Sequence, residues 1–163
     1  MYTYSTILGA ALLNTSERLA DCTSFQEFCG AIDSTDALSY IFFNYIEDAA
    51  VDNYAVLGRN EDSIYITSTF PQGNRNKNFR PVVDILFRQK FDRDSDHPYD
   101  TMTILEEKVD EIMDEFFNQS EFENFSVQEY KIDDIGYSPK KELDKWCICI
   151  VRLEYVTGPY FLR

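Results

Sequence analysis

Three alternating aspartates, Asp92, Asp94 and Asp96, are the residues whose spacing most suggests chemistry. Alternate carboxylates open the calcium loop of an EF-hand, because they converge on one hard cation. The match then ends, since His97 stands at the sixth position, where the loop needs glycine, and Thr103 at the twelfth, where a bidentate glutamate belongs. We therefore interpret this segment as a solvated turn and predict no metal site.

No other residues form a recognisable catalytic arrangement. His97 is the single histidine and precedes Pro98, and no serine or cysteine nucleophile stands in a recognisable setting. The acids Glu106, Glu107 and Glu115 belong to a run of like charges, which is typical of an exposed helix face. The sequence contains no glycine-rich phosphate loop and no Gly-x-Ser-x-Gly elbow. We predict a protein that is not an enzyme and has neither catalytic residues nor a cofactor.

The four cysteines are Cys22, Cys29, Cys147 and Cys149. Their spacing does not match a zinc site, and residues 1–14 lack the basic segment of an export signal, so we expect synthesis in the cytoplasm and no disulfides. Cys147 and Cys149 alternate with apolar residues and would point to one face of a strand. We predict buried thiols that line a core.

Length and composition indicate one folded, very acidic domain that spans residues 1–163. The chain is 44% hydrophobic, with 13 Phe and 11 Tyr, which is too apolar for a disordered chain despite a net charge of −14. That charge repels nucleic acids and anionic membranes, and no apolar run approaches the roughly 18 residues of a spanning helix. We therefore expect neither sequence-specific DNA binding nor a membrane association.

The first third of the chain, residues 1–52, carries mainly helix signals. Ser5 can cap a helix with an apolar stripe through Leu12, and Ser24–Glu27 has the pattern of a capping box. The second helix would run through Cys29 and end near Gly30. Residues 38–46 are short, apolar and aromatic, so periodicity allows a helix or a strand; their flanking residues favour a helix.

Residues 63–157 show strand alternation around one amphipathic helix. We predict strands over 63–70 and 81–91, joined as a hairpin by a long loop over 71–78. In the second strand Val83, Ile85, Phe87 and Phe91 would face the core, and the opposite face would become progressively solvated.

The helix is predicted over 103–118, with a capping box at its start and Leu105, Val109, Ile112, Met113 and Phe116 as its buried stripe. Strands over 125–132 and 145–157 would form a closing hairpin. The element order predicts an α+β fold, in which an antiparallel sheet of about four strands has helices packed on one face and a helical segment precedes it.

Charge divides sharply along the chain. Residues 75–93 contain six basic and two acidic residues, whereas residues 96–134 contain thirteen acidic and two basic residues. Both runs can be solvated surfaces, as most charge runs are. Alternatively, the basic segment of one subunit contacts the acidic surface of the next in a ring. On that interpretation the predicted interface residues are Arg75, Lys77, Arg80, Arg88, Lys90, Glu107, Asp110, Glu111 and Asp114.

Three segments together resemble the tail-terminator, or tail-completion, proteins of tailed bacteriophages. They are the strand Arg-Pro-Val-Val-Asp-Ile-Leu-Phe at 80–87, the amphipathic helix at 104–117 and the closing Ile-Cys-Ile-Val-Arg-Leu-Glu-Tyr at 148–155. The resemblance lies in element order, size and hydrophobic pattern over residues 63–157.

The resemblance implies a structural virion protein, made in the host cytoplasm and located in the tail or neck of the particle. Such a protein assembles as a ring, commonly a hexamer, between the tail tube and the head–tail connector, and DNA passes through its lumen without sequence-specific binding. Another interpretation stays open: a small acidic immunity or inhibitor protein that neutralises a basic toxin or nuclease by charge complementarity.

Overall fold

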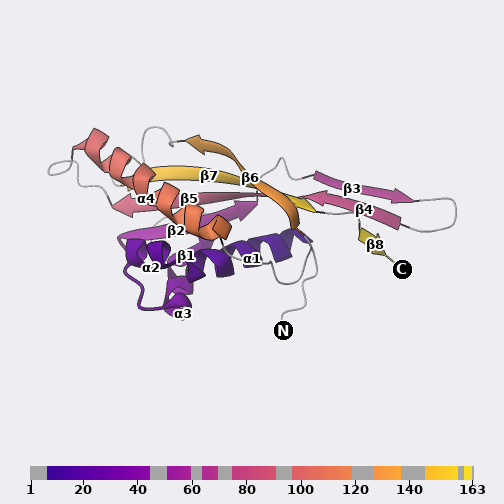
Figure 1. Ribbon diagram of the computed structural model, residues 1–163, viewed down its shortest axis with the longest axis horizontal. Helices are drawn as coiled ribbons and strands as arrows, with labels where there is room; N and C mark the ends of the chain where they lie inside the picture. The colour runs from indigo at the N-terminus through magenta and orange to yellow at the C-terminus, as the bar shows by residue number, and fades with distance from the viewer. Residues whose placement is uncertain are drawn as a thin grey trace.

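The computed structural model describes residues 7–44, 51–59, 64–69, 75–90, 97–118, 127–136, 146–157 and 160–162 (Figure 1). Its helices are α1 (Ile7–Asp21), α2 (Thr23–Cys29), α3 (Ser34–Ala37), the 3₁₀ turn η1 (Leu38–Tyr40) and α4 (Pro98–Asn118). Its strands are β1 (Ile41–Phe43), β2 (Asn53–Arg59), β3 (Ile64–Thr69), β4 (Arg75–Arg80), β5 (Val82–Lys90), β6 (Val127–Gly136), β7 (Trp146–Thr157) and β8 (Tyr160–Leu162).

The strands form two sheets. The larger has the order β1-β2-β5-β7-β6, with β1 parallel to β2 and every other pair antiparallel. The smaller is antiparallel, with the order β3-β4-β8, and it extends from one end of the larger sheet (Figure 1). The α+β fold is confirmed, but the larger sheet has five strands and one parallel pair, so the prediction of about four antiparallel strands was incomplete.

The helices pack on one face of the larger sheet, as predicted. The core contains Ala55 and Leu57 of β2, Ile85 and Phe87 of β5 and Cys149 of β7. The strand register pairs Ala55 with Phe87 and Phe87 with Cys149, so these side chains share one face. The predicted buried stripe of α4, Leu105, Val109, Ile112, Met113 and Phe116, lies on this face in full.

The opposite face of the larger sheet is not progressively solvated, contrary to the prediction. Tyr54 is fully buried there and makes edge-to-face ring contacts with Phe42 and Trp146. The Arg88 side chain is also buried, and its Nη1 donates a hydrogen bond to the Tyr54 hydroxyl at 3.2 Å. Arg88 can therefore be buried on this face, because its guanidinium lies over the Tyr54 ring and donates a hydrogen bond to the Tyr54 hydroxyl.

Helices α2 and α4 begin before the two predicted capping boxes, so both predicted helix starts were wrong. Helix α2 begins one residue before Ser24, and its N-cap Cys22 makes no side-chain capping bond, so the box at Ser24–Glu27 does not form. Its predicted end is confirmed, because Gly30 adopts the left-handed conformation with φ 77° that closes a helix. Helix α4 begins at Pro98, ahead of the predicted Thr103. Ser5 lies outside the described residues.

Within the segment 38–46, residues 38–40 form a 3₁₀ turn and residues 41–43 form strand β1, so the prediction that favoured a helix was wrong there. Strand β1 pairs with β2 from Ile41 opposite Ala55 to Phe43 opposite Leu57. Strand β2 itself was not predicted. Residues 45–50 lie outside the described residues. A short apolar segment takes its structure from the sheet edge available to it, since local propensity alone does not decide between helix and strand.

The central hairpin also differs from the prediction. Strand β3 pairs with β4, from Ile64 opposite Arg80 to Thr69 opposite Arg75, so residues 75–78 belong to a strand and not to the predicted loop. Strand β5 pairs with β2 and β7 in the other sheet. The closing hairpin of β6 and β7 is confirmed. The basic segment is consequently divided between two sheets.

Candidate functional site

The acidic surface begins with the outer face of α4. Glu107, Asp110, Glu111 and Asp114 are all exposed, while the helix buries the side that faces the sheet. This arrangement follows from the apolar stripe, because a helix that buries one face turns the residues between the stripe positions toward solvent. The structure thus places all four predicted acids on one accessible helix, and their contact with another subunit remains a prediction.

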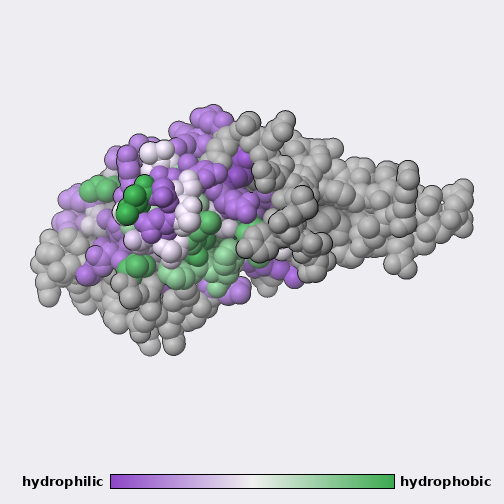
Figure 2. Space-filling model, turned by 90° about the horizontal axis from the view of Figure 1, so that it is seen from below, coloured by the Kyte–Doolittle hydropathy of each residue, from purple (hydrophilic) through white to green (hydrophobic). Residues whose placement is uncertain are grey.

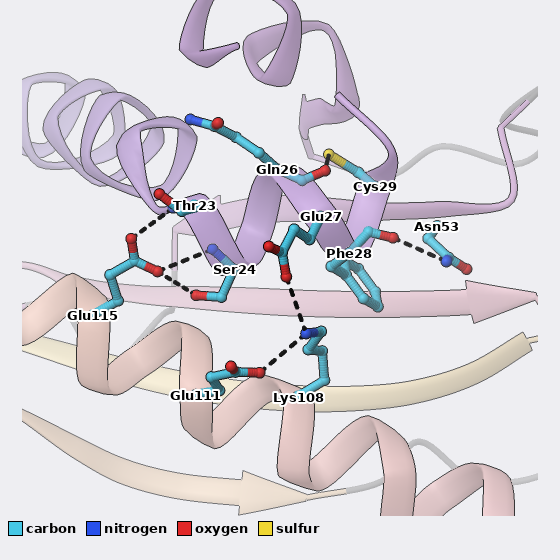
Figure 3. A network of polar contacts seen from close by, with 10 residues as sticks. All are labelled: Thr23, Ser24, Gln26, Glu27, Phe28, Cys29, Asn53, Lys108, Glu111 and Glu115. Carbon is cyan, nitrogen blue, oxygen red and sulfur yellow. Dashed lines mark hydrogen bonds and ion pairs between the residues drawn. The ribbon is translucent and has the colours of Figure 1, made fainter. Parts of the chain in front are cut away.

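Glu115 of α4 caps the neighbouring helix α2 (Figure 3). Its carboxylate accepts hydrogen bonds from the backbone N–H of Thr23 at 2.6 Å, from the backbone N–H of Ser24 at 2.9 Å and from the Ser24 hydroxyl. Partial burial alone would raise the pKa of Glu115, but the bonds donated by Ser24 and Thr23 outweigh it and lower that pKa. A carboxylate at this helix N-terminus therefore joins α2 to α4.

Lys108 forms a second link between α4 and α2. Its ammonium lies 3.0 Å from the Glu111 carboxylate and 3.7 Å from the Glu27 carboxylate (Figure 3). The hydrogen bond with Glu111 is the main reason that the pKa of Lys108 is raised. The pair with Glu111 has the helical i, i+3 spacing, whereas the pair with Glu27 crosses between helices.

A groove of about 400 Å³ lies beside this ion-pair network. Its lining consists of Glu27, Phe28, Asn53, Gln89, Ile104, Glu107, Lys108 and Glu111. Asn53 sits at the start of β2 and is fixed there, since its side-chain amide donates to the Phe28 carbonyl at 3.0 Å. Ile104 is 58% exposed and gives this lining an accessible apolar side chain. We name this feature the α2–α4 groove.

The surface around the helices is otherwise strongly polar. On the face shown in Figure 2, hydrophilic side chains cover most of the described surface, and hydrophobic residues form small groups between them. Besides Ile104, the exposed large apolar residues are Ile32, Leu38 and Phe43. Single exposed apolar residues of this kind are normal for a folded protein and identify no site by themselves.

The five predicted basic residues occupy three different environments. Arg75, Lys77 and Arg80 belong to β4, whose backbone pairs with β3 along its length and with β8 at Arg75 and Lys77. Arg88 is only 4% exposed and contacts Tyr54, so it is not presented to a neighbouring subunit. Lys90 is exposed and lies 3.4 Å from Asp52, at the groove end of β5.

All four cysteines are free thiols in the structure. Cys22, Cys147 and Cys149 are buried, as predicted, whereas Cys29 is only partly buried; burial raises the pKa of Cys149 to about 12. Asp92, Asp94 and Asp96 lie outside the described residues. Among the residues that are described, no group of three His, Cys, Asp or Glu could hold a metal ion. His97 is exposed and lies 3.8 Å from Asp100.

The sequence analysis missed four residues that build the groove region: Glu27, Ile104, Lys108 and Glu115. Helical spacing on α4 places Ile104, Lys108 and Glu115 on one side of that helix, which was a usable signal. Nothing local identifies α2 as the helix that faces them, because that contact joins segments about ninety residues apart.

The comparisons with known proteins give a likeness of fold. No protein-family model matches the chain, and no curated protein matches its sequence. Among solved structures, the fold is similar to that of a chain in the virion of a native gene transfer agent particle, with a TM-score of 0.52 and 9% identity. The match covers 95% of this chain and 100% of that chain. No helix among the described residues has the length and apolarity that crossing a membrane requires.

Proposed function

We propose that the protein is a structural component of a phage-like particle and forms a ring at the tail-completion junction. The observation that carries the proposal is the likeness of fold to a virion chain, because it extends over 95% of this chain and the whole of the other. The element pattern of tail-terminator proteins, noted in residues 63–157, agrees with it independently. The ring is a hexamer in this proposal, as that resemblance implies, and its neighbours are tail-tube and connector proteins.

The distribution of charge supports assembly from identical subunits. Four exposed acids lie on α4, and three basic residues lie on β4, in a different sheet at the other end of β5 (Figure 1). Two different, complementary surfaces on one chain make a head-to-tail contact, and such contacts close into a ring when the rotation allows it. We propose that this ring is not an enzyme and needs no cofactor.

The net charge of −14 also suits a channel for DNA. An acidic lumen repels the phosphate backbone, so a passing polyanion is not retained. We therefore propose that DNA passes through the ring without sequence-specific contacts.

Negative-stain images of the purified protein, with a parallel duplex-DNA retention assay, test the proposal. We expect annular particles of uniform diameter with a central opening, and no retention of DNA at physiological salt. Single compact particles at every concentration would contradict it. In that case binding to a basic protein toxin would identify the protein as an inhibitor instead.

A further inference from the structure

The α2–α4 groove combines negative charge with an apolar side chain. Glu27, Glu107 and Glu111 contribute three carboxylates, and Lys108 contributes one ammonium, so the lining carries a net charge of −2. Ile104 stands on the same lining and exposes more than half of its surface. A polar surface with an accessible apolar contact is typical of a protein-binding site, because ion pairs set the register and apolar burial supplies affinity.

The chain's own basic strand cannot occupy this groove. Gln89 lines the groove near one end of β5, whereas β4 ends at Arg80 immediately before the other end of β5. A strand rises about 3.3 Å per residue, so Val82 and Gln89 are about 23 Å apart along β5. In Figure 1, β3 and β4 extend away from the end of the larger sheet that α2 and α4 cover. Contact between the two features therefore requires two molecules.

We propose that the α2–α4 groove of one copy receives the basic strand β4 of a second copy and is the acidic half of the ring contact. This assignment rests on the proposed ring and goes beyond it, because it selects the groove from the whole acidic surface of α4. Lys77 and its basic neighbours on β4 meet Glu107 and Glu111 in the contact, and Ile104 becomes buried by it.

The groove is a better receptor than the rest of α4 for a physical reason. Asp110 and Asp114 are exposed and do not belong to the groove lining, so ion pairs made by them would stay hydrated and weak. In the groove, α2 stands opposite α4 and the partner would displace water. Charge pairs in such a setting contribute much more to affinity than pairs at an open surface.

A matched pair of charge reversals on α4 tests the assignment. Glu107→Lys alters the groove, and Asp110→Lys makes the same change of charge one turn away, outside the groove. We expect Glu107→Lys to raise the dissociation constant of self-association about tenfold and Asp110→Lys to change it less than about threefold. Sedimentation velocity over a concentration series measures both, and thermal melting verifies that each variant is folded.

Mixing two variants shows whether β4 is the occupant. Lys77→Glu alone should weaken self-association as Glu107→Lys does. In an equimolar mixture each contact pairs opposite charges again, so the affinity should return to within about threefold of the wild-type value. If the wild type assembles but the mixture does not recover, or both reversals on α4 act equally, the groove assignment is overturned and the ring stands. A wild type that does not self-associate overturns the ring and the groove contact together.

Discussion

The two ends of this molecule are constructed differently. At the helix end, α1, α2 and α4 enclose the core and are joined by side chains that satisfy each other's helix termini. At the strand end, β3, β4 and β8 form a small sheet, and its strand β4 contains Arg75, Lys77 and Arg80. We infer that substitutions inside the helix end change mainly stability, whereas charge changes on β4 change mainly assembly.

Core truncation at the helix end should have the largest effect. Phe25 is fully buried and contacts the rings of Phe28 and Phe87, with centroids 6.2 and 6.4 Å away. Phe25→Ala removes that packing and leaves a cavity, so we expect a loss of about 3–5 kcal/mol in the free energy of unfolding, measured by urea denaturation. Lys77→Ala at the strand end should change it by less than about 0.5 kcal/mol. Equal losses would remove the distinction between the two ends.

The buried arginine of α1 should rank second. The Arg18 guanidinium donates a hydrogen bond to the Phe116 carbonyl at 3.0 Å near the end of α4 and lies 5.3 Å from the Phe116 ring centroid. Arg18→Met retains much of the apolar volume and removes the donor, so we expect a loss of about 1–3 kcal/mol by the same measurement. A variant as stable as the wild type would show that this contact does not hold α4 in place.

Removal of the carboxylate that caps α2 should have a smaller effect. Glu115→Gln retains the shape of the side chain and weakens its bonds to Thr23 and Ser24, so we expect a loss of about 1 kcal/mol at pH 7. Glu111→Gln, one turn earlier and exposed, is the control and should cost less than about 0.5 kcal/mol.

This cap also predicts a pH dependence. The folded-state pKa of Glu115 is lowered, so its stabilisation is complete above the unfolded-state value, about 4.5, and is lost as the pH falls through the folded-state pKa. The stability difference between wild type and Glu115→Gln should therefore shrink below about pH 4.5. A difference that is constant between pH 7 and pH 3 would contradict the cap.

The smallest stability effect is expected at Lys108, where assembly should respond in the opposite direction. The Glu27 and Glu111 carboxylates that it pairs with are mostly exposed, so Lys108→Met should change the free energy of unfolding by less than about 0.5 kcal/mol. The same substitution makes the α2–α4 groove more negative, and self-association should become tighter at low salt. Weaker association, measured by sedimentation velocity, would count against β4 as the occupant.

The elements with long, regular hydrophobic patterns could be predicted from the sequence. The stripe from Leu105 to Phe116 and the alternation in β5 identify buried faces, because each pattern repeats over several turns or residues. The segment of strand β1 was wrongly expected to be helical, and strand β2 was not predicted. Ile41–Phe43 is only three residues long, and its strand form depends on β2, which lies beyond residues 45–50.

The candidate site was predictable only in part for the same reason. The four exposed acids of α4 follow from the helix pattern, since each lies between positions of the buried stripe. The groove could not be predicted in this way, because its lining also includes residues of α2, β2 and β5, which lie far from α4 in the sequence. Arg88 shows the converse limit: its charge suggested a surface role, and only the position of Tyr54 explains its burial.

Absolute mass in solution, measured by light scattering on a sizing column at low and high salt, tests the central claim most directly. A head-to-tail ring held by opposite charges predicts a single species of several subunits at low salt that dissociates as ionic strength rises. The resemblance to tail-terminator proteins makes a hexamer the expected size. A monomer at every salt and protein concentration would contradict the account.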